Sequence, residues 1–176
     1  SNLINNICNN IQGLIIGRLF SPAIMGYYSQ AKKLEEIPST SISQIIDSVS
    51  YPILSECQND KEQLIAILRK FISIISFITV PLMLLLIVIG KPLIVLIFSS
   101  KWIPSVPYFQ ILCIAGLAIC MQSVNYNVIA AIGRSKILFK WTIIKRSIGI
   151  AVIMIGALFG IYGIIIGTTL SSWILY

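Results

Sequence analysis

Long uncharged runs dominate the pattern of hydrophobic and polar positions along this chain. Three of them, Phe71–Gly90, Val106–Gly133 and Ser147–Tyr176, contain no Asp, Glu, Lys or Arg. Each is long enough for a helix that crosses a hydrocarbon core of about 30 Å, which takes about 20 residues. We therefore expect membrane-spanning helices in all three runs.

Proline, glycine and polar clusters divide the whole chain into six expected helices. Ser21-Pro22 ends the first helix, and a polar connection at 57–63 separates the second from the third. We expect Pro38 to interrupt the second helix, Pro52 to lie near its end, and Gly90-Lys91-Pro92 to break the third, because proline removes a backbone donor. The expected bounds are 2–20, 24–56, 64–98, 107–132, 137–159 and 161–176.

The last two helices are separated on an argument from length. Taken as one helix, Ser147–Tyr176 would be about 45 Å long, at 1.5 Å per residue, which exceeds the hydrocarbon core without a strong tilt. A tight return at Gly160–Gly163 divides it into two helices of suitable length. The fifth helix then begins either before or after Lys145 and Arg146. If it begins near Ile137, the two cations lie more than two turns inside it, and one of them facing a cavity would bind an anion. If it begins later, they are headgroup anchors.

The first helix carries a stripe of amides at intervals of three and four residues. An unpaired amide in hydrocarbon costs several kcal/mol, so this face contacts either a watery cavity or other helices. The cavity is the interpretation we favour, and interhelical hydrogen bonds are the alternative. The stripe consists of Asn2, Asn5, Asn6, Asn9 and Gln12.

The second helix repeats this pattern, with an apolar stripe opposite a polar face. The polar face includes Glu36, Gln44 and Asp47, with Lys32 and Lys33 further toward its start. A carboxylate within a membrane helix is a candidate functional group, whose partner would be a cation, a proton or an amide of the first helix. The alternatives are a structural hydrogen bond for Asp47 and interfacial anchoring for the two lysines.

Polar residues near the end of the fourth helix have two interpretations. Gln122, Asn125 and Asn127 either line the same cavity or cap the turn at Gly133, and we favour the cap.

Composition supports a membrane protein. The chain is 57% hydrophobic and 11% charged, whereas soluble domains carry about 25% charged residues. The net charge of +7 is spread singly or in pairs between apolar runs, which disfavours nucleic-acid binding and suits contacts with lipid headgroups. The four cysteines lack metal-ligand spacing and are interpreted as small apolar residues. The sequence has no His and no catalytic or metal-binding motif, so we do not expect an enzyme.

The ends and the charge distribution give two further expectations. The chain opens at Ser1 without Met and stops at Tyr176 inside an apolar stretch, so we expect a piece of a longer protein.

Alternating helices place the second–third and fourth–fifth connections on one side of the membrane, and the excess of Lys and Arg predicts that this side is cytoplasmic. That side carries Lys61, Arg69, Lys70, Arg134 and Lys136, against Arg18 and Lys101 opposite.

The order of landmarks along the chain resembles one transporter family. The series begins with Leu14-Ile-Ile-Gly17-Arg18-Leu-Phe-Ser-Pro22 and Met25-Gly26-Tyr27-Tyr28. It continues with Pro38, Tyr51-Pro52, Pro81, Lys91-Pro92, Phe98, Trp102 and Gly133-Arg134. This series resembles the C-terminal half of bacterial polysaccharide flippases. They are the lipopolysaccharide and O-antigen type exporters of the multidrug/oligosaccharidyl-lipid/polysaccharide superfamily.

The resemblance implies an all-α, polytopic bundle of about six membrane helices that forms one half of a two-lobed transporter. Such proteins move an undecaprenyl-pyrophosphate-linked oligosaccharide across the bacterial inner membrane by alternating access. The implied partners are this lipid-linked oligosaccharide, membrane lipids and a missing N-terminal half. No cofactor is expected, and a proton or a sodium ion is the candidate for coupling. Our candidate cavity residues are Asn5, Asn9, Gln12, Arg18, Lys32, Lys33, Gln44, Asp47 and Arg146.

Two other functions stay open. A cation-coupled multidrug exporter of the same superfamily would have an apolar and acidic cavity, which the amides and the basic excess disfavour. A structural membrane protein without transport would bury the amide stripe completely among neighbouring helices.

Overall fold

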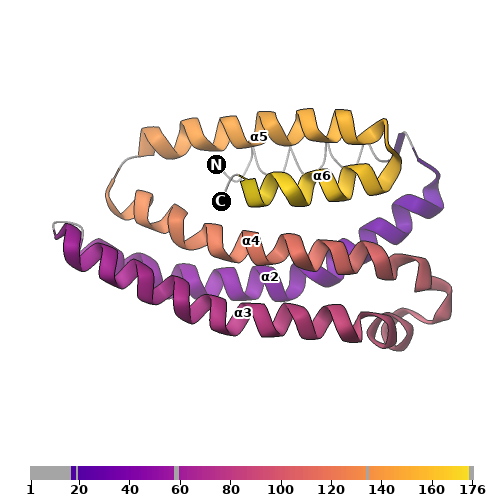
Figure 1. Cartoon of the computed structure of the whole chain (residues 1–176), viewed down its shortest axis with the longest axis horizontal. Coiled ribbons are helices and arrows are strands. Elements are labelled where there is room, and N and C mark those ends of the chain that lie inside the picture. The colour runs from indigo at the N-terminus through magenta and orange to yellow at the C-terminus, as the bar shows by residue number, and fades with distance from the viewer. Residues whose placement is uncertain (1–16, 19, 58–59, 134, 175–176) are drawn as a thin grey trace.

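The computed structural model describes residues 17–18, 20–57, 60–133 and 135–174, and the elements within these ranges are all helices (Figure 1). The expected first helix, 2–20, lies almost wholly outside the described residues. The elements in chain order are α2 (Pro22–Glu56), α3 (Lys61–Phe98), the 3₁₀ helix η1 (Ser100–Ser105), α4 (Val106–Ala131), α5 (Ser135–Ala157) and α6 (Gly160–Ile174).

Local capping explains why two helices begin earlier than expected. Ser21 caps α2, with its Oγ accepting from the Ile24 N–H at 3.4 Å, and Pro22 occupies the first helical position. Asp60 caps α3, where its Oδ1 accepts from the N–H groups of Glu62 and Gln63 at 3.0 and 3.1 Å. The polar connection is therefore three residues shorter than the predicted 57–63.

The predicted interruption at Pro38 and the predicted break at Gly90-Lys91-Pro92 were wrong, because α2 and α3 continue through them. Pro52 lies near the end of α2, as predicted. Both helices pack along α4, and packing against a neighbour holds the two sides of a proline in line despite the lost hydrogen bond. Hydroxyl groups add local support, as where Thr40 Oγ1 donates to the Glu36 carbonyl at 2.5 Å.

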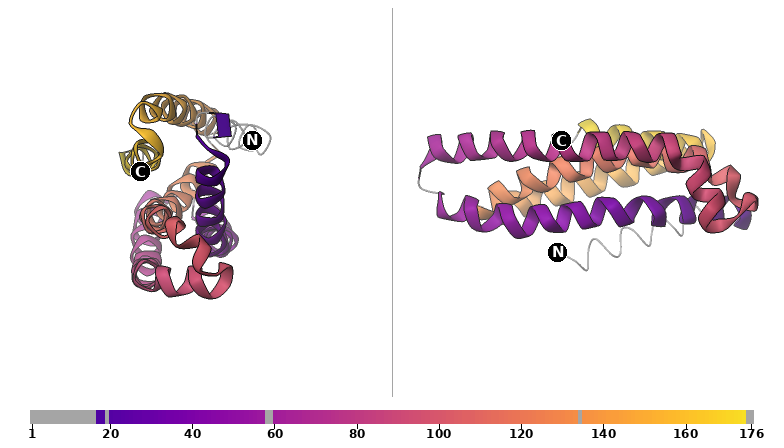
Figure 2. Two further views of the ribbon diagram at one scale, coloured as in Figure 1. Left: turned by 90° about the vertical axis from the view of Figure 1, so that its right-hand side faces the viewer. Right: turned by 90° about the horizontal axis from the view of Figure 1, so that it is seen from below.

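Helix α4 is the centre of the bundle. It packs against α2, α3 and α6, whereas α5 packs mainly on α6 (Figures 1 and 2). Viewed along the bundle, α5 and α6 form a pair on one side of α4, with α2 and α3 on the other (Figure 2, left). Phe109 and Cys113 of α4 are completely buried in the main core, together with Met83 of α3 and Ile164 of α6.

Two glycines allow the tight return between α5 and α6. Gly160 has φ +82°, a left-handed conformation that favours glycine. A Cβ on Gly156 would lie 2.8 Å from the carbonyl oxygen of Gly163, so the paired helices approach too closely for a side chain there. The predicted division into two helices is present, but the turn is at Leu158–Phe159, just before the predicted return at Gly160–Gly163, which lies within α6.

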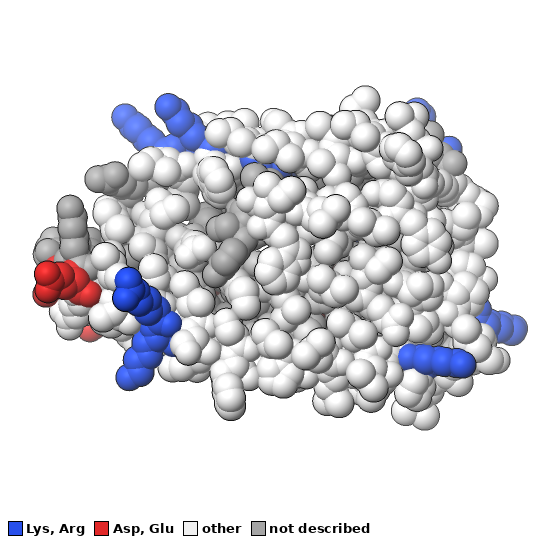
Figure 3. Space-filling model, in the orientation of Figure 1, with Lys and Arg blue, Asp and Glu red and all other residues white. Residues whose placement is uncertain are grey.

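The surface between the two ends of the bundle is apolar. Phe77 and Leu158 are 82% and 84% exposed, and charged side chains on the face in Figure 3 lie mostly toward the two ends. By length and composition, two segments of the described chain are able to cross a membrane, Glu62–Phe98 and Ser100–Ala131; Gly160–Ile174 is a shorter apolar helix. An apolar belt between polar ends is the surface that lipid requires.

Candidate functional site

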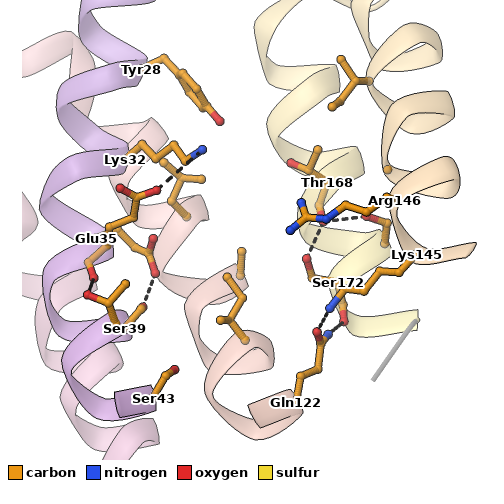
Figure 4. A pocket seen from close by; sticks show the side chains of 18 of the residues that line it. Tyr28, Lys32, Glu35, Ser39, Ser43, Gln122, Lys145, Arg146, Thr168 and Ser172 are labelled. Atoms are coloured by element: carbon orange, nitrogen blue, oxygen red, sulfur yellow. Dashed lines mark hydrogen bonds and ion pairs between the residues drawn. The ribbon is translucent and has the colours of Figure 1, made fainter. Parts of the chain in front are cut away.

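A cavity of about 540 Å³ separates α2 from the α5–α6 pair, with α4 between them (Figure 4). Its lining combines charged groups, hydroxyls and amides with apolar side chains of α4 and α5. The polar lining residues are Tyr28, Lys32, Glu35, Glu36, Ser39, Thr40, Ser43, Gln44, Asp47, Gln122, Lys145, Arg146, Thr168, Ser171 and Ser172.

Helical spacing brings one row of polar residues from α2 to the cavity. Tyr28, Lys32, Glu35, Ser39 and Ser43 follow one another at intervals of three or four, so they share a face of the helix. Ser39 Oγ donates a hydrogen bond to Glu35 Oε1. Lys32 Nζ lies 3.7 Å from a carboxylate oxygen of Glu36, the next residue along the chain from Glu35.

The opposite wall is basic and rich in hydroxyls. Lys145 and Arg146 come from α5, and Thr168 and Ser172 come from α6 (Figure 4). Lys145 Nζ donates to Gln122 Oε1, and Gln122 Nε2 donates to the Ser172 carbonyl at 2.5 Å. Because α5 begins at Ser135, both cations lie well inside the helix. The structure therefore has the cavity arrangement rather than the headgroup-anchor alternative.

Asp47 lies at the edge of the cavity and contacts α4. Ser123 Oγ and Asn127 Nδ2 both donate to Asp47 Oδ1, the latter at 2.8 Å. Asn127 Nδ2 also lies 2.8 Å from Ser50 Oγ. Among the described residues, these partners are those of the interhelical hydrogen-bond alternative; the amides of the first helix lie outside the described residues.

The structure brings together some of the predicted cavity residues and not others. Lys32, Gln44, Asp47 and Arg146 line the cavity. Lys33 and Arg18 are exposed and are not part of its lining. The remaining predictions, Asn5, Asn9 and Gln12, lie outside the described residues.

The prediction that the polar residues near the end of α4 cap the turn at Gly133 was wrong. Gln122 and Asn127 bind across helices instead of capping the turn. The helix end needs no side-chain cap, because the Ile132 N–H donates to Val128 and the Gly133 N–H donates to Ala130. Gly133, at φ +75°, then turns the chain.

Sequence reasoning also missed Glu35 and Ser39. Glu36 was assigned to the polar face, whereas Glu35 shares the spacing of Lys32, Ser39 and Ser43 and is the buried carboxylate of the cavity. That shared spacing was the available signal.

The arrangement suits a polar ligand with anionic groups against α5 and hydroxyl groups against α2. Cations and hydroxyls bind phosphate or carboxylate through charge-assisted hydrogen bonds, and carboxylates accept from sugar hydroxyls. In the described part of the chain, no group of three or more Cys, Asp or Glu residues is placed to hold a metal ion.

Comparison with known proteins gives one family and several relatives. A family model described as "Polysaccharide biosynthesis protein" matches residues 1–107. The lipopolysaccharide biosynthesis protein WzxC of Escherichia coli K12 is 28% identical over 166 residues, or 94% of this chain and 34% of the relative. A membrane protein encoded in the cps region of Klebsiella pneumoniae is 31% identical, with the same coverage.

A transport protein is also similar. The succinoglycan biosynthesis transport protein ExoT of Rhizobium meliloti is 24% identical over 162 residues, or 91% of this chain and 32% of the relative. The chain thus spans about a third of the length of these relatives. No solved structure matches the chain.

Proposed function

The chain belongs to the polysaccharide biosynthesis protein family, and we propose that its full-length protein translocates an undecaprenyl-pyrophosphate-linked oligosaccharide across the bacterial inner membrane. The names of the relatives support this proposal, since they describe lipopolysaccharide biosynthesis in one case and succinoglycan transport in another. In this proposal the chain is the second six-helix lobe, it pairs with an N-terminal half, and the two lobes alternate access to a shared cavity.

The observation that carries the proposal is the pair of cations in the middle of α5 that line the cavity. Lys145 and Arg146 lie opposite the hydroxyls and the aromatic ring on α2 (Figure 4). A cation inside a membrane is costly and requires an anionic or polar partner. A lipid diphosphate supplies such a partner, and the attached sugars supply hydroxyls for the α2 wall.

Individual roles follow from position. Arg146 and Lys145 bind the diphosphate, because paired cations contact phosphate oxygens through short hydrogen bonds. Lys32 and Gln44 contact the sugar or its diphosphate from α2, and Asp47 orders the α2–α4 interface beside them. We propose that Asn5, Asn9 and Gln12 extend the polar lining, and that Arg18 and Lys33 contact substrate or headgroups outside the described cavity.

A multidrug exporter is the alternative with a specific observation in its favour. Glu35, Glu36 and Asp47 line the cavity, and an acidic cavity suits cationic drugs. However, Glu36 is paired with Lys32, and Asp47 accepts hydrogen bonds from α4. Lys145 and Arg146 on the opposite wall would repel a cationic drug, so we place this function second.

The deciding experiment is a translocation assay on the full-length protein in proteoliposomes. We expect movement of a fluorescent lipid-linked oligosaccharide to the opposite leaflet and no extrusion of cationic drugs. Arg146→Met should lower transport by roughly 10-fold or more, the effect of losing a charge-assisted hydrogen bond worth about 1.5–3 kcal/mol. Arg69→Met, on the exposed surface of α3, is the matched control and should transport normally. Equal transport by both variants would contradict the proposal, as would drug extrusion without lipid transport.

A further inference from the structure

We propose that Glu35 is a proton-binding carboxylate, and that it takes up a proton when an anionic ligand occupies the α5 wall of the cavity. The assignment of the proton site depends only on the position and surroundings of Glu35. The coupling to an anion rests on the proposed function, which names a lipid diphosphate as that ligand.

Glu35 is held in one position by contacts from two helices. It is 4% exposed on α2, and Ser39 Oγ donates to its Oε1. On α4, Gly116 packs directly against this pair: a Cβ there would collide with the Glu35 carboxylate and lie 2.6 Å from Ser39 Oγ. The carboxyl group is thus wedged between Ser39 and the α4 backbone, at the wall of the cavity.

The groups around Glu35 do not balance a negative charge in the described structure. On its own helix, Lys32 is paired with Glu36 at 3.7 Å. The α4 side presents the thiols of Cys113 and Cys120, and α3 presents the neutral Met83. The described part of the chain contains no ion pair to Glu35, and the Ser39 group that donates to it is a neutral hydroxyl.

Besides Lys32, two further cations line the same cavity from the opposite wall. α5 presents Lys145 and Arg146, and α6 presents hydroxyl groups only, from Thr168, Ser171 and Ser172 (Figure 4). Lys145 is bonded to the neutral side chain of Gln122, so its charge remains available to act across the cavity.

A proton fits this site better than a metal cation does. A buried carboxylate without a cationic partner is costly when ionised and is neutralised by a proton. A hard cation would need several oxygen ligands. Around Glu35 the contacts supply the Ser39 hydroxyl, thiols and a thioether. These surroundings favour the proton.

Anion binding and protonation are then linked. When the cavity is empty of anions, the charges of Lys145 and Arg146 favour ionised Glu35 across the cavity. An anion bound to these cations cancels that effect, so Glu35 takes up a proton from solvent. Because linkage is reciprocal, a lower pH must strengthen anion binding by the same factor. The substrate and the proton therefore bind together.

Infrared spectroscopy of the full-length protein tests the proton site without any substrate. At mildly acidic pH, where exposed carboxylates stay ionised, the wild type should show the carbonyl band of a protonated carboxylic acid, and Glu35→Gln should lose it. Glu62→Gln, in the exposed first turn of α3, is the matched control and should keep the band. An unchanged band in Glu35→Gln, or no such band in the wild type, would overturn the proton site.

Proton uptake on ligand addition tests the coupling. Undecaprenyl diphosphate added to the full-length protein in weak buffer, at a pH where the ligand-free protein lacks the infrared band, should cause uptake of up to about one proton per molecule, the limit for a single linked site. The wild-type measurement needs no variant, so it does not depend on the folding of Glu35→Gln, which should bind the probe without proton uptake. Binding without uptake by the wild type would overturn the coupling. Failure of the wild type to bind the probe would overturn both the coupling and the proposed substrate, while the infrared band would still decide the proton site.

Discussion

Gln122 of α4 accepts a hydrogen bond from the side-chain ammonium group of Lys145 on α5. The same amide donates to the backbone carbonyl of Ser172 on α6, at 2.5 Å. One side chain therefore joins the α5–α6 pair to the centre of the bundle, at the wall of the cavity. If the two sides of the cavity move relative to each other, this amide is a contact that must be kept or exchanged.

Removal of the Gln122 amide should loosen the α5–α6 pair. In Gln122→Ala, Lys145 and the Ser172 carbonyl lose their partner, which costs about 1–3 kcal/mol for a buried group left unsatisfied. Thermal unfolding of the full-length protein should show a lower midpoint than the wild type. Gln63→Ala, at an exposed position near the start of α3, is the control. An equal midpoint for the two variants would show that the amide link adds no stability.

Gly116 should tolerate no side chain. Gly116→Ala places a methyl group against Glu35 and Ser39, and overpacking of this kind costs about 1–3 kcal/mol. Gly149→Ala is the matched control, because its Cβ would meet nothing within 4 Å and alanine favours a helix by about 0.5–1 kcal/mol. Chemical denaturation should rank Gly149→Ala above the wild type and Gly116→Ala below it. The reverse order would contradict the packing described for α2 and α4.

Asp47 and Asn127 should behave as a coupled pair. A double-mutant cycle with Asp47→Ala and Asn127→Ala should give an interaction energy of about 0.5–3 kcal/mol in unfolding experiments, because the two side chains share a hydrogen bond. Additive effects would exclude the pair as a structural link. Loss of transport in Asp47→Ala with unchanged stability would instead assign Asp47 to the substrate or to a coupling ion.

The connections at the two ends of the bundle should lie on opposite sides of the membrane. The structure places the α2–α3 and α4–α5 connections at one end, and η1 and the α5–α6 turn at the other (Figure 1). The distribution of Lys and Arg predicts that the first end is cytoplasmic. In a cysteine-free background, a cysteine at Lys101 should react with a membrane-impermeant reagent added to intact cells, and a cysteine at Lys61 should not. The opposite result would invert the predicted orientation.

Much of the fold follows from local sequence. Long uncharged runs predicted an all-helical chain, and helix length predicted the division of the last run into two helices. The resemblance drawn from Gly17-Arg18 and the later landmarks is confirmed by the match to the polysaccharide biosynthesis family. Pro38 was misjudged because local propensity accounts for the lost hydrogen bond but not for α4, which contacts α2 at Glu35 and at Asp47, on either side of this proline.

The cavity was harder to predict because it depends on helix rotation and on distant partners. Glu35 and Glu36 differ by about 100° around the helix axis, and only packing against Gly116 shows which carboxylate is buried. Gln122 and Asn127 bind Ser172 and Asp47, which lie 50 and 80 residues away in sequence. No local pattern indicates such partners, so a capping role was the natural expectation.

Photo-crosslinking to a lipid-linked oligosaccharide tests most directly whether this cavity is the substrate path. A photoactivatable residue at Ser171, on the cavity wall, should crosslink to the sugar portion of the labelled substrate in the full-length protein. The same residue at Phe77, 82% exposed on the outer face of α3, should not crosslink to the sugar. Sugar crosslinks at Ser171 alone are the result that we predict. No crosslink from Ser171, or equal crosslinking from both positions, would contradict the account.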